Sequence, residues 1–216
     1  MVGFASISIA MLPRFHKREN VETSSAHRPF AVRAESVCFA SGMSDAILEF
    51  FRHEKPDSSG RMLRDILAWD DDELEYTHDY IQWLFPNVDP SMFNPDAPTL
   101  TRETIAAFSK DSSLRNQLAI NFDRMARFYG FDVTHADEHS TVVPAANFNE
   151  QTANWLHARN HNLLRITRIL KCLTILGQPE LARAFFNALD LLYKSKSGIE
   201  IGETTFLYWK NALRVV

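Results

Sequence analysis

The sequence predicts an all-α fold, a single compact domain of about seven or eight helices joined by two long loops. Hydrophobic residues make up 45% of the 216 residues, close to the globular average and enough for a substantial core. The chain has only 7 glycines. Few of its segments alternate apolar and polar residues with the period of two that half-buried strands show. These observations favour helices over strands and turns.

In the N-terminal half, capping residues and prolines set the helix boundaries. Asp70 is a suitable N-cap for a helix that Pro86 ends. Thr101 is a suitable N-cap for another, although its capping box is incomplete because Thr104 stands where Glu or Gln is usual. Gly130 suits the position just after a helix end. The helices predicted here cover residues 45–53, 62–68, 71–85, 102–109 and 112–129.

In the C-terminal half, Gly177 ends one predicted helix and Pro179 opens the next. The helices predicted here cover residues 155–176, 179–194 and 203–213. Two stretches between helices are predicted to be long loops. The first, residues 86–98, is rich in proline. The second, residues 131–152, includes a local cluster of histidine and acidic residues.

The first 42 residues differ in composition from the remainder. They carry five basic and three acidic side chains, a net charge of +2, and contain many serines and alanines. Three interpretations stay open: a disordered extension, an organelle transit peptide, or a segment upstream of a true start at Met43. Ser44 or Asp45 can cap the first helix. The folded domain is therefore predicted to cover residues 43–216.

Charge and cysteine usage restrict the class of protein. The net charge of −4 argues against nucleic-acid binding by bulk attraction. No run of about 18 apolar residues is present, so no transmembrane span is expected. Cys38 and Cys172 lie in different contexts, which makes a disulfide improbable and a reducing, cytoplasmic location the first expectation. A transit peptide would instead indicate an organelle. The sequence predicts no cofactor, and oligomeric state is not readable from it.

Several blocks of residues, in a fixed order, carry a family resemblance. They are Asp65–Trp69, His78–Pro86, Asn94–Pro95, Ala97–Thr101, Phe128–Gly130, Asn160–Lys171 and Leu176–Gly177. Over roughly residues 45–190 the chain resembles the conserved N-terminal domain of the opioid growth factor receptor family, and in length a short, domain-only member of it. The resemblance implies a peptide ligand, since the animal receptor is described as binding an enkephalin peptide. It also implies nuclear or membrane-associated placement, with peripheral membrane association one form. It supplies no catalytic residue set.

The polar residues of two predicted central helices, 71–85 and 155–176, form the candidate site. We expect their polar stripes to face each other, which would bring together His78, Asp79, Gln82, His161, Arg165 and Arg168. One interpretation is a structural ion network in which the two arginines pair with Glu75 and Asp79. The other is a cleft that binds an anion or a peptide carboxylate through the arginine forks.

Other chemistry has weaker support in the sequence. His157 and His161 are four residues apart, as are His135 and His139, but a third ligand is not evident, so no metal site is expected. Cys172 lies among apolar residues and is predicted to be a packed thiol. No phosphate loop or nucleophile elbow occurs, so no catalytic residue is predicted.

Three functions follow as hypotheses. The first is a non-enzymatic module that binds a peptide or another protein. The alternative is a small-molecule enzyme or sensor whose polar site comprises His78, Gln82, His161 and Arg165. The third is a purely structural or interaction domain, which a deep polar pocket would count against.

Overall fold

The computed structural model describes residues 45–214, except 92–93, 137–138 and 196–197. The three interpretations of residues 1–42 therefore lie outside the described residues. Within the described part the chain forms eleven helices and two strands. In chain order these are α1 (Ala46–Phe51), α2 (Leu63–Leu67), α3 (Asp71–Tyr76), α4 (Ile81–Leu84), α5 (Arg102–Lys110), α6 (Ser112–Phe128), β1 (Phe131–Ala136), β2 (His139–Pro144), α7 (Phe148–Trp155), α8 (His161–Ile175), α9 (Pro179–Lys194), α10 (Gly198–Ile201) and α11 (Glu203–Ala212).

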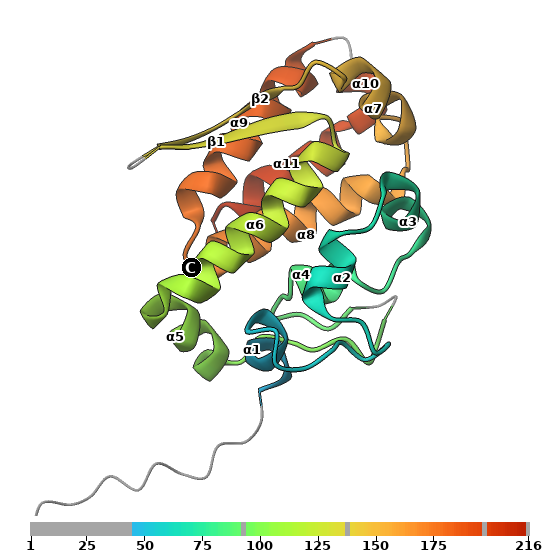
Figure 1. Ribbon diagram of the computed structural model, residues 1–216. Helices are drawn as coiled ribbons and strands as arrows, with labels where there is room; N and C mark the ends of the chain where they lie inside the picture. The colour runs from blue at the N-terminus through green and yellow to red at the C-terminus, as the bar shows by residue number, and fades with distance from the viewer. Residues whose placement is uncertain (1–44, 92–93, 137–138, 196–197, 215–216) are drawn as a thin grey trace, which may run out of the picture. The chain divides into compact units, whose positions relative to one another are not determined.

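The all-α prediction is wrong in one region, because the predicted loop 131–152 contains an antiparallel β-hairpin. Strands β1 and β2 pair in register, with Val133 opposite Val142 and Thr134 opposite Thr141. These β-branched residues favour an extended backbone. Phe131 and Val142 are buried on the inner face. The hairpin runs alongside α9 next to the end of α6, and this packing supplies the core that a lone hairpin lacks (Figure 1).

The predicted helix 71–85 is also wrong as a continuous helix. It is two short helices, α3 and α4, separated by residues 77–80. Asp70 caps α3 as predicted, since its side chain accepts a hydrogen bond from the Glu73 amide. Thr77 then adopts an extended conformation, with φ −90° and ψ 131°. The carbonyls at the end of α3 are bound by a side chain from α8, described below, so they do not need the amides of a following turn.

The predicted helix 155–176 begins too early, and α7 lies mostly in the predicted loop 131–152. Helix α7 ends at Trp155, and α8 begins at His161. Between them Arg159 has a left-handed φ of 64°, and Asn160 caps α8 by accepting a hydrogen bond from the Asn162 amide at 2.8 Å. His157 and His161 therefore do not share a helix.

Most other predicted elements are confirmed. Asp45 caps α1 through the amides of Ile47 and Leu48, and α9 starts at Pro179. The capping box of α5 is complete after all, because the Thr104 hydroxyl accepts from the Thr101 amide. The short helix α10 precedes the predicted last helix. Together with the division of 71–85 into two helices and with α7, it brings the number of helices in the described residues to eleven.

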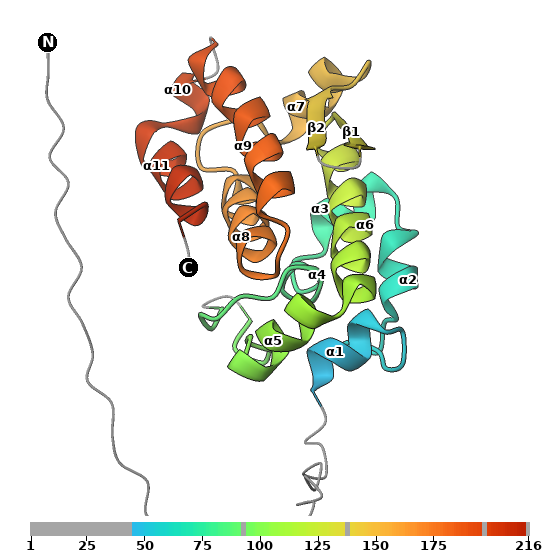
Figure 2. The ribbon, with the colours of Figure 1, turned by 90° about the vertical axis from the view of Figure 1, so that its left-hand side faces the viewer.

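The core is built around α6. Its apolar stripe is buried and consists of Leu114, Leu118, Phe122 and Met125, continued by Tyr129. Phe122 meets Phe185 of α9 with ring centroids 5.1 Å apart. Figure 2 shows α6 between α2 on one side and α8, α9 and α11 on the other. This arrangement places α8 beside the interrupted segment of α3 and α4.

Gly130 is a position where the fold requires glycine. Its φ is +84°, and an added Cβ would lie 2.9 Å from Gln151 Cβ and 3.1 Å from Phe148 Cα. We expect Gly130→Ala to lower the free energy of unfolding by roughly 2–4 kcal/mol through both strain and overlap. Gly60→Ala is the matched control, since Gly60 has φ +81° but open space around it, and should cost only about 1 kcal/mol. Equal losses in urea denaturation would contradict the steric part of this account.

Candidate functional site

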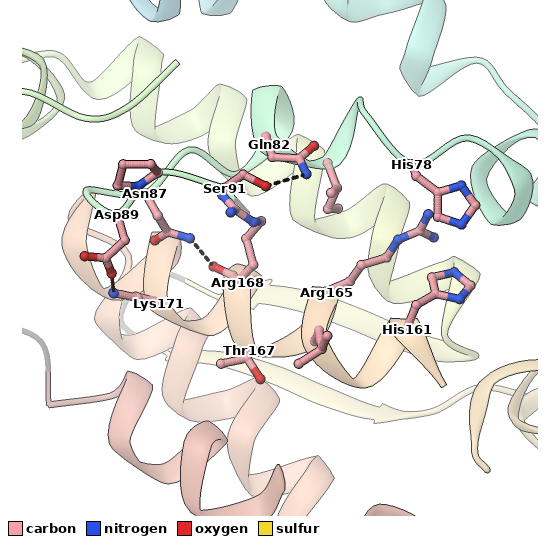
Figure 3. Close-up of a pocket in the computed structure, with 13 residues that line it drawn as sticks. His78, Gln82, Asn87, Asp89, Ser91, His161, Arg165, Thr167, Arg168 and Lys171 are labelled. Carbon is pink, nitrogen blue, oxygen red and sulfur yellow. Dashed lines mark hydrogen bonds and ion pairs between the residues drawn. The ribbon is translucent and has the colours of Figure 1, made fainter. Parts of the chain in front are cut away.

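A pocket of ≈ 670 Å³ lies between α8 and the segment that runs from the end of α3 to Ser91. This volume is typical of ligand sites. It is lined by His78, Ile81, Gln82, Asn87, Asp89, Pro90, Ser91, His161, Leu164, Arg165, Thr167, Arg168 and Lys171. Five of the six predicted site residues are therefore brought together, and Figure 3 shows how their side chains lie.

Arg165 is buried, with 5% exposure, and its guanidinium holds the chain after α3. Its Nη1 donates to the Leu74 carbonyl at 2.9 Å, and its Nη2 donates to the Thr77 carbonyl at 2.7 Å. Nη1 also donates to Asn162 Oδ1 at 3.1 Å. The guanidinium carbon lies 5.4 Å from the Tyr80 ring centre, a cation–π distance. Arg165 thus completes the C-terminal end of α3.

Arg168 lies one turn further along α8, and its guanidinium makes fewer hydrogen bonds than that of Arg165. Its Nη1 donates to the Phe85 carbonyl at 3.2 Å. No carboxylate of the described residues is paired with it. Burial lowers the pKa of this guanidinium, with a smaller opposing effect from the charge of Asp89. In Figure 3 Arg168 points toward Gln82 and Ser91, whereas Arg165 points the other way, toward His78 and His161.

Two side-chain amides cover the wall opposite α8. Gln82 and Asn87 are each 5% exposed. Gln82 Nε2 donates to Ser91 Oγ at 3.3 Å, and Asn87 Nδ2 donates to the Arg168 carbonyl at 3.3 Å. Their oxygens, Oε1 and Oδ1, have no hydrogen-bond partner among the described residues. Buried amide oxygens are usually satisfied, so the wall has two acceptors in need of donors.

The two ends of the pocket differ in charge. At one end Lys171 forms an ion pair with Asp89. At the other the rings of His78 and His161 have centroids 5.0 Å apart. Burial and the charge of Arg165 lower the pKa of His161, and the nearby Glu75 opposes them, with its Oε1 at 3.5 Å from His161 Nε2. Ile81 and Leu164 add apolar surface to the lining.

Asp79 is the predicted site residue that the fold places elsewhere. Its carboxylate accepts from Arg61 at 2.8 Å and from the Ser59 hydroxyl at 2.9 Å. Glu75 does not pair with Arg165 or Arg168, and its Oε2 accepts from Asn162 Nδ2 at 2.8 Å. The predicted ion network, with the α8 arginines paired to Glu75 and Asp79, is therefore wrong. The arginines bind main-chain carbonyls.

Several lining residues were missed from the sequence. Lys171 could have been found, since it lies three residues after Arg168 on the same helical stripe. Asn87, Asp89, Pro90 and Ser91 belong to the predicted proline-rich loop, where periodicity gives no signal. Their placement depends on long-range contacts, such as the hydrogen bond of Asn87 with α8.

The other side chains considered from the sequence, a cysteine and several histidines, do not contribute to this pocket's binding groups. Cys172 is fully buried in α8, and burial raises the pKa of its thiol, as expected for a packed side chain. His135 accepts or donates a hydrogen bond with Asp123 at 3.0 Å. In the described part of the chain no three histidine, cysteine or acidic side chains are grouped to hold a metal. None of its helices is both long and apolar enough to cross a membrane.

The two arginines should differ sharply in what they contribute to folding. Arg165→Met removes the guanidinium donors of the Leu74 and Thr77 carbonyls and leaves the Tyr80 hydroxyl as a donor to Leu74. We expect a loss of roughly 2–5 kcal/mol in the free energy of unfolding. Arg168→Met removes one long hydrogen bond and also relieves a desolvated charge, so its effect should stay within about 1 kcal/mol. Urea denaturation followed by circular dichroism measures both. Similar losses would show that both arginines serve the same structural role.

The depressed pKa of His161 predicts a pH-dependent stability. In the folded protein the imidazole faces Arg165, Glu75, His78 and His157, and it takes up a proton at lower pH than in the unfolded chain. Its contribution to stability is therefore complete above about pH 6.5 and is lost as the pH falls below that value. His161→Gln should reduce the slope of unfolding free energy against pH in this window. An unchanged slope would contradict the prediction.

Comparison with known proteins places this chain clearly. The family model for the opioid growth factor receptor conserved region matches residues 45–215. Among curated proteins, the rat opioid growth factor receptor is 37% identical over 173 residues, which cover 74% of this chain and 29% of that protein. The human receptor is 38% identical over 148 residues, which cover 64% and 21%.

The opioid growth factor receptor-like protein 1 of Xenopus tropicalis is 36% identical over 138 residues, covering 61% of this chain and 26% of that protein. The chain thus spans less than a third of the length of these relatives. No solved structure matches. The matched residues include all the described elements from α1 to α11. The resemblance found in the sequence is confirmed, and the chain belongs to the opioid growth factor receptor family through its conserved region.

Proposed function

We propose that this domain is a non-enzymatic binding module whose ligand is a peptide or a segment of another protein, held in the pocket along α8. The observation that carries the proposal is the state of the polar groups in the pocket. Within the described residues, one guanidinium without a carboxylate partner and two amide oxygens without donors lie beside apolar side chains. A peptide complements all of these, since it combines main-chain N–H groups, carboxylates and apolar side chains.

The lining is better suited to binding than to covalent catalysis. Its serine, Ser91, accepts hydrogen bonds from Gln82 Nε2 and from the Asn94 amide. His78 and His161 lie away from it in the pocket (Figure 3). The family name of the relatives, a growth factor receptor, also supports a ligand-binding role. A well-formed pocket of this size counts against a purely structural domain.

The alternative is a small-molecule enzyme or sensor with its site at the histidine end. His78, Gln82, His161 and Arg165 line the same pocket, and His161 has a lowered pKa, which keeps it neutral near pH 7. A small molecule bound at this end would be lost with His78→Ala and retained with Lys171→Ala. A peptide that spans the pocket would depend on both ends.

Blocking the pocket tests the proposal. Random peptides displayed on phage are selected on the purified domain, and the affinity of the selected peptides is measured by fluorescence polarisation. We expect Leu164→Trp to weaken binding by about tenfold or more, because the indole fills the pocket beside α8. Ile120→Trp is the matched control. Leu164 and Ile120 are exposed helical side chains, at 56% and 51%, but Ile120 lies on α6 and not among the lining residues.

The outcomes separate the proposed function from its rivals. Selected peptides that bind the Leu164→Trp and Ile120→Trp variants equally would place peptide binding elsewhere on the domain. A selection that enriches no peptide would contradict a peptide-binding module. Circular dichroism of both variants, unchanged from the original chain, confirms that the substitutions leave the fold intact.

A further inference from the structure

We propose that the ligand is an extended peptide segment bearing a carboxylate that is bound by Arg168, with the peptide N–H groups donated to Gln82 and Asn87. This inference rests on the proposed function and specifies the ligand class. It assigns different roles to Arg165 and Arg168, which the sequence does not distinguish. Arg165 shapes the pocket, and Arg168 is the anion receptor in it.

The argument starts from the unmet bonding capacity of Arg168. A guanidinium has five N–H donors. In Arg168 only Nη1 has a partner among the described residues, the Phe85 carbonyl at 3.2 Å. Arg165, by contrast, contacts three carbonyl groups and Asn162. A partly buried charge without a counter-ion is unfavourable, and a carboxylate bound through two parallel hydrogen bonds corrects this.

A second cation lies one turn further along the helix. Lys171 pairs with Asp89, whose side chain is 70% exposed. An ion pair with such an exposed partner contributes little and can exchange. An incoming carboxylate therefore meets Arg168 first and gains from Lys171 as Asp89 moves away. The end of the pocket opposite to His78 and His161 becomes the acid-binding end.

The amide oxygens distinguish a peptide from a simple anion. Gln82 Oε1 and Asn87 Oδ1 can only accept hydrogen bonds, so they repel a free phosphate or carboxylate and complement N–H donors. Both oxygens are covered by surrounding atoms. The terminal amide torsion of glutamine is broad, and the Gln82 bond to Ser91 is long at 3.3 Å. A small rotation therefore presents Oε1 to a bound main chain.

The length of the pocket agrees with an extended segment. Five lining residues of α8 follow one stripe, namely His161, Leu164, Arg165, Arg168 and Lys171. From the first to the last the helix rises about 15 Å. An extended chain covers this distance in about four or five residues. Apolar contact with Ile81, Pro90 and Leu164 then lies next to the acid-binding end.

Hexapeptide pools test the inference directly. The pools are acetylated and amidated, with one position fixed in turn as Asp, Asn or Lys and the others randomised, and capture on the immobilised domain is quantified by mass spectrometry. We expect Asp pools to bind about tenfold better than Asn pools. Arg168→Gln should reduce this ratio to about one, and Arg168→Glu should reverse it in favour of Lys pools. Arg183→Gln, an exposed arginine on α9, is the control that keeps the preference.

A parallel set with free C-terminal carboxylates identifies the source of the acid. Improved capture of these pools without a fixed Asp assigns Arg168 to the chain end, whereas equal capture assigns it to a side chain. Peptides that bind in a manner sensitive to Leu164→Trp but with no acid preference would overturn the inference and leave the proposed function standing. An acid preference that survives in Arg168→Glu would also overturn it. Failure of every pool to bind would overturn the proposed function itself.

Discussion

The buried guanidinium of Arg165 is the interaction on which the rest of the site depends. It brings a full positive charge into the interior, with 5% of the residue exposed. Carbonyl dipoles compensate this charge, from Leu74, Glu75 and Thr77 at the end of α3. Because these carbonyls are bound by a side chain, α3 can end at Tyr76 without continuing into α4. The extended residues between them then form one wall of the pocket.

Hydrogen bonds of the same kind, from a helix side chain to a main-chain carbonyl, recur between Trp69 and Phe85. Side chains of α6 and α8 donate to main-chain carbonyls wherever the helical pattern is broken. Arg124 donates to Trp69 and Asn121 to Leu84, both from α6, and Arg168 of α8 donates to Phe85. Exposed loops usually satisfy such carbonyls with water. Here long helices do so from the core, which fixes an irregular segment against α8 and creates a pocket whose position is set by rigid elements.

Much of the helical framework was predictable from the sequence, because caps, stops and apolar periodicity are local signals. Asp45, Asp70, Gly130 and Pro179 each fix a boundary that the structure confirms. The break in 71–85 was not predictable in this way. It depends on contacts between residues about ninety positions apart, such as Arg165 with Leu74. The hairpin was hidden because its strands are short and border residues that lack periodicity.

The candidate site was predictable in its location more than in its chemistry. The two polar stripes do face each other, and five predicted residues line one pocket. Both arginines lie on the same face of the predicted helix. The sequence could not show that main-chain carbonyls occupy the donors of Arg165 but not most of those of Arg168. Nor could it show that Asp79 turns away to Arg61. Such differences arise from the three-dimensional path of the chain between α3 and α4.

Hydrogen exchange of the Arg165→Met variant tests the central claim most directly. Mass spectrometry compares amide protection in the peptides that cover residues 77–87 with protection in α6 and α9. If Arg165 holds the interrupted segment, exchange in residues 77–87 should accelerate by about tenfold or more while α6 and α9 keep their protection. Unchanged protection in residues 77–87, or an equal loss across all three regions, would show that the guanidinium does not specifically position the wall of the pocket.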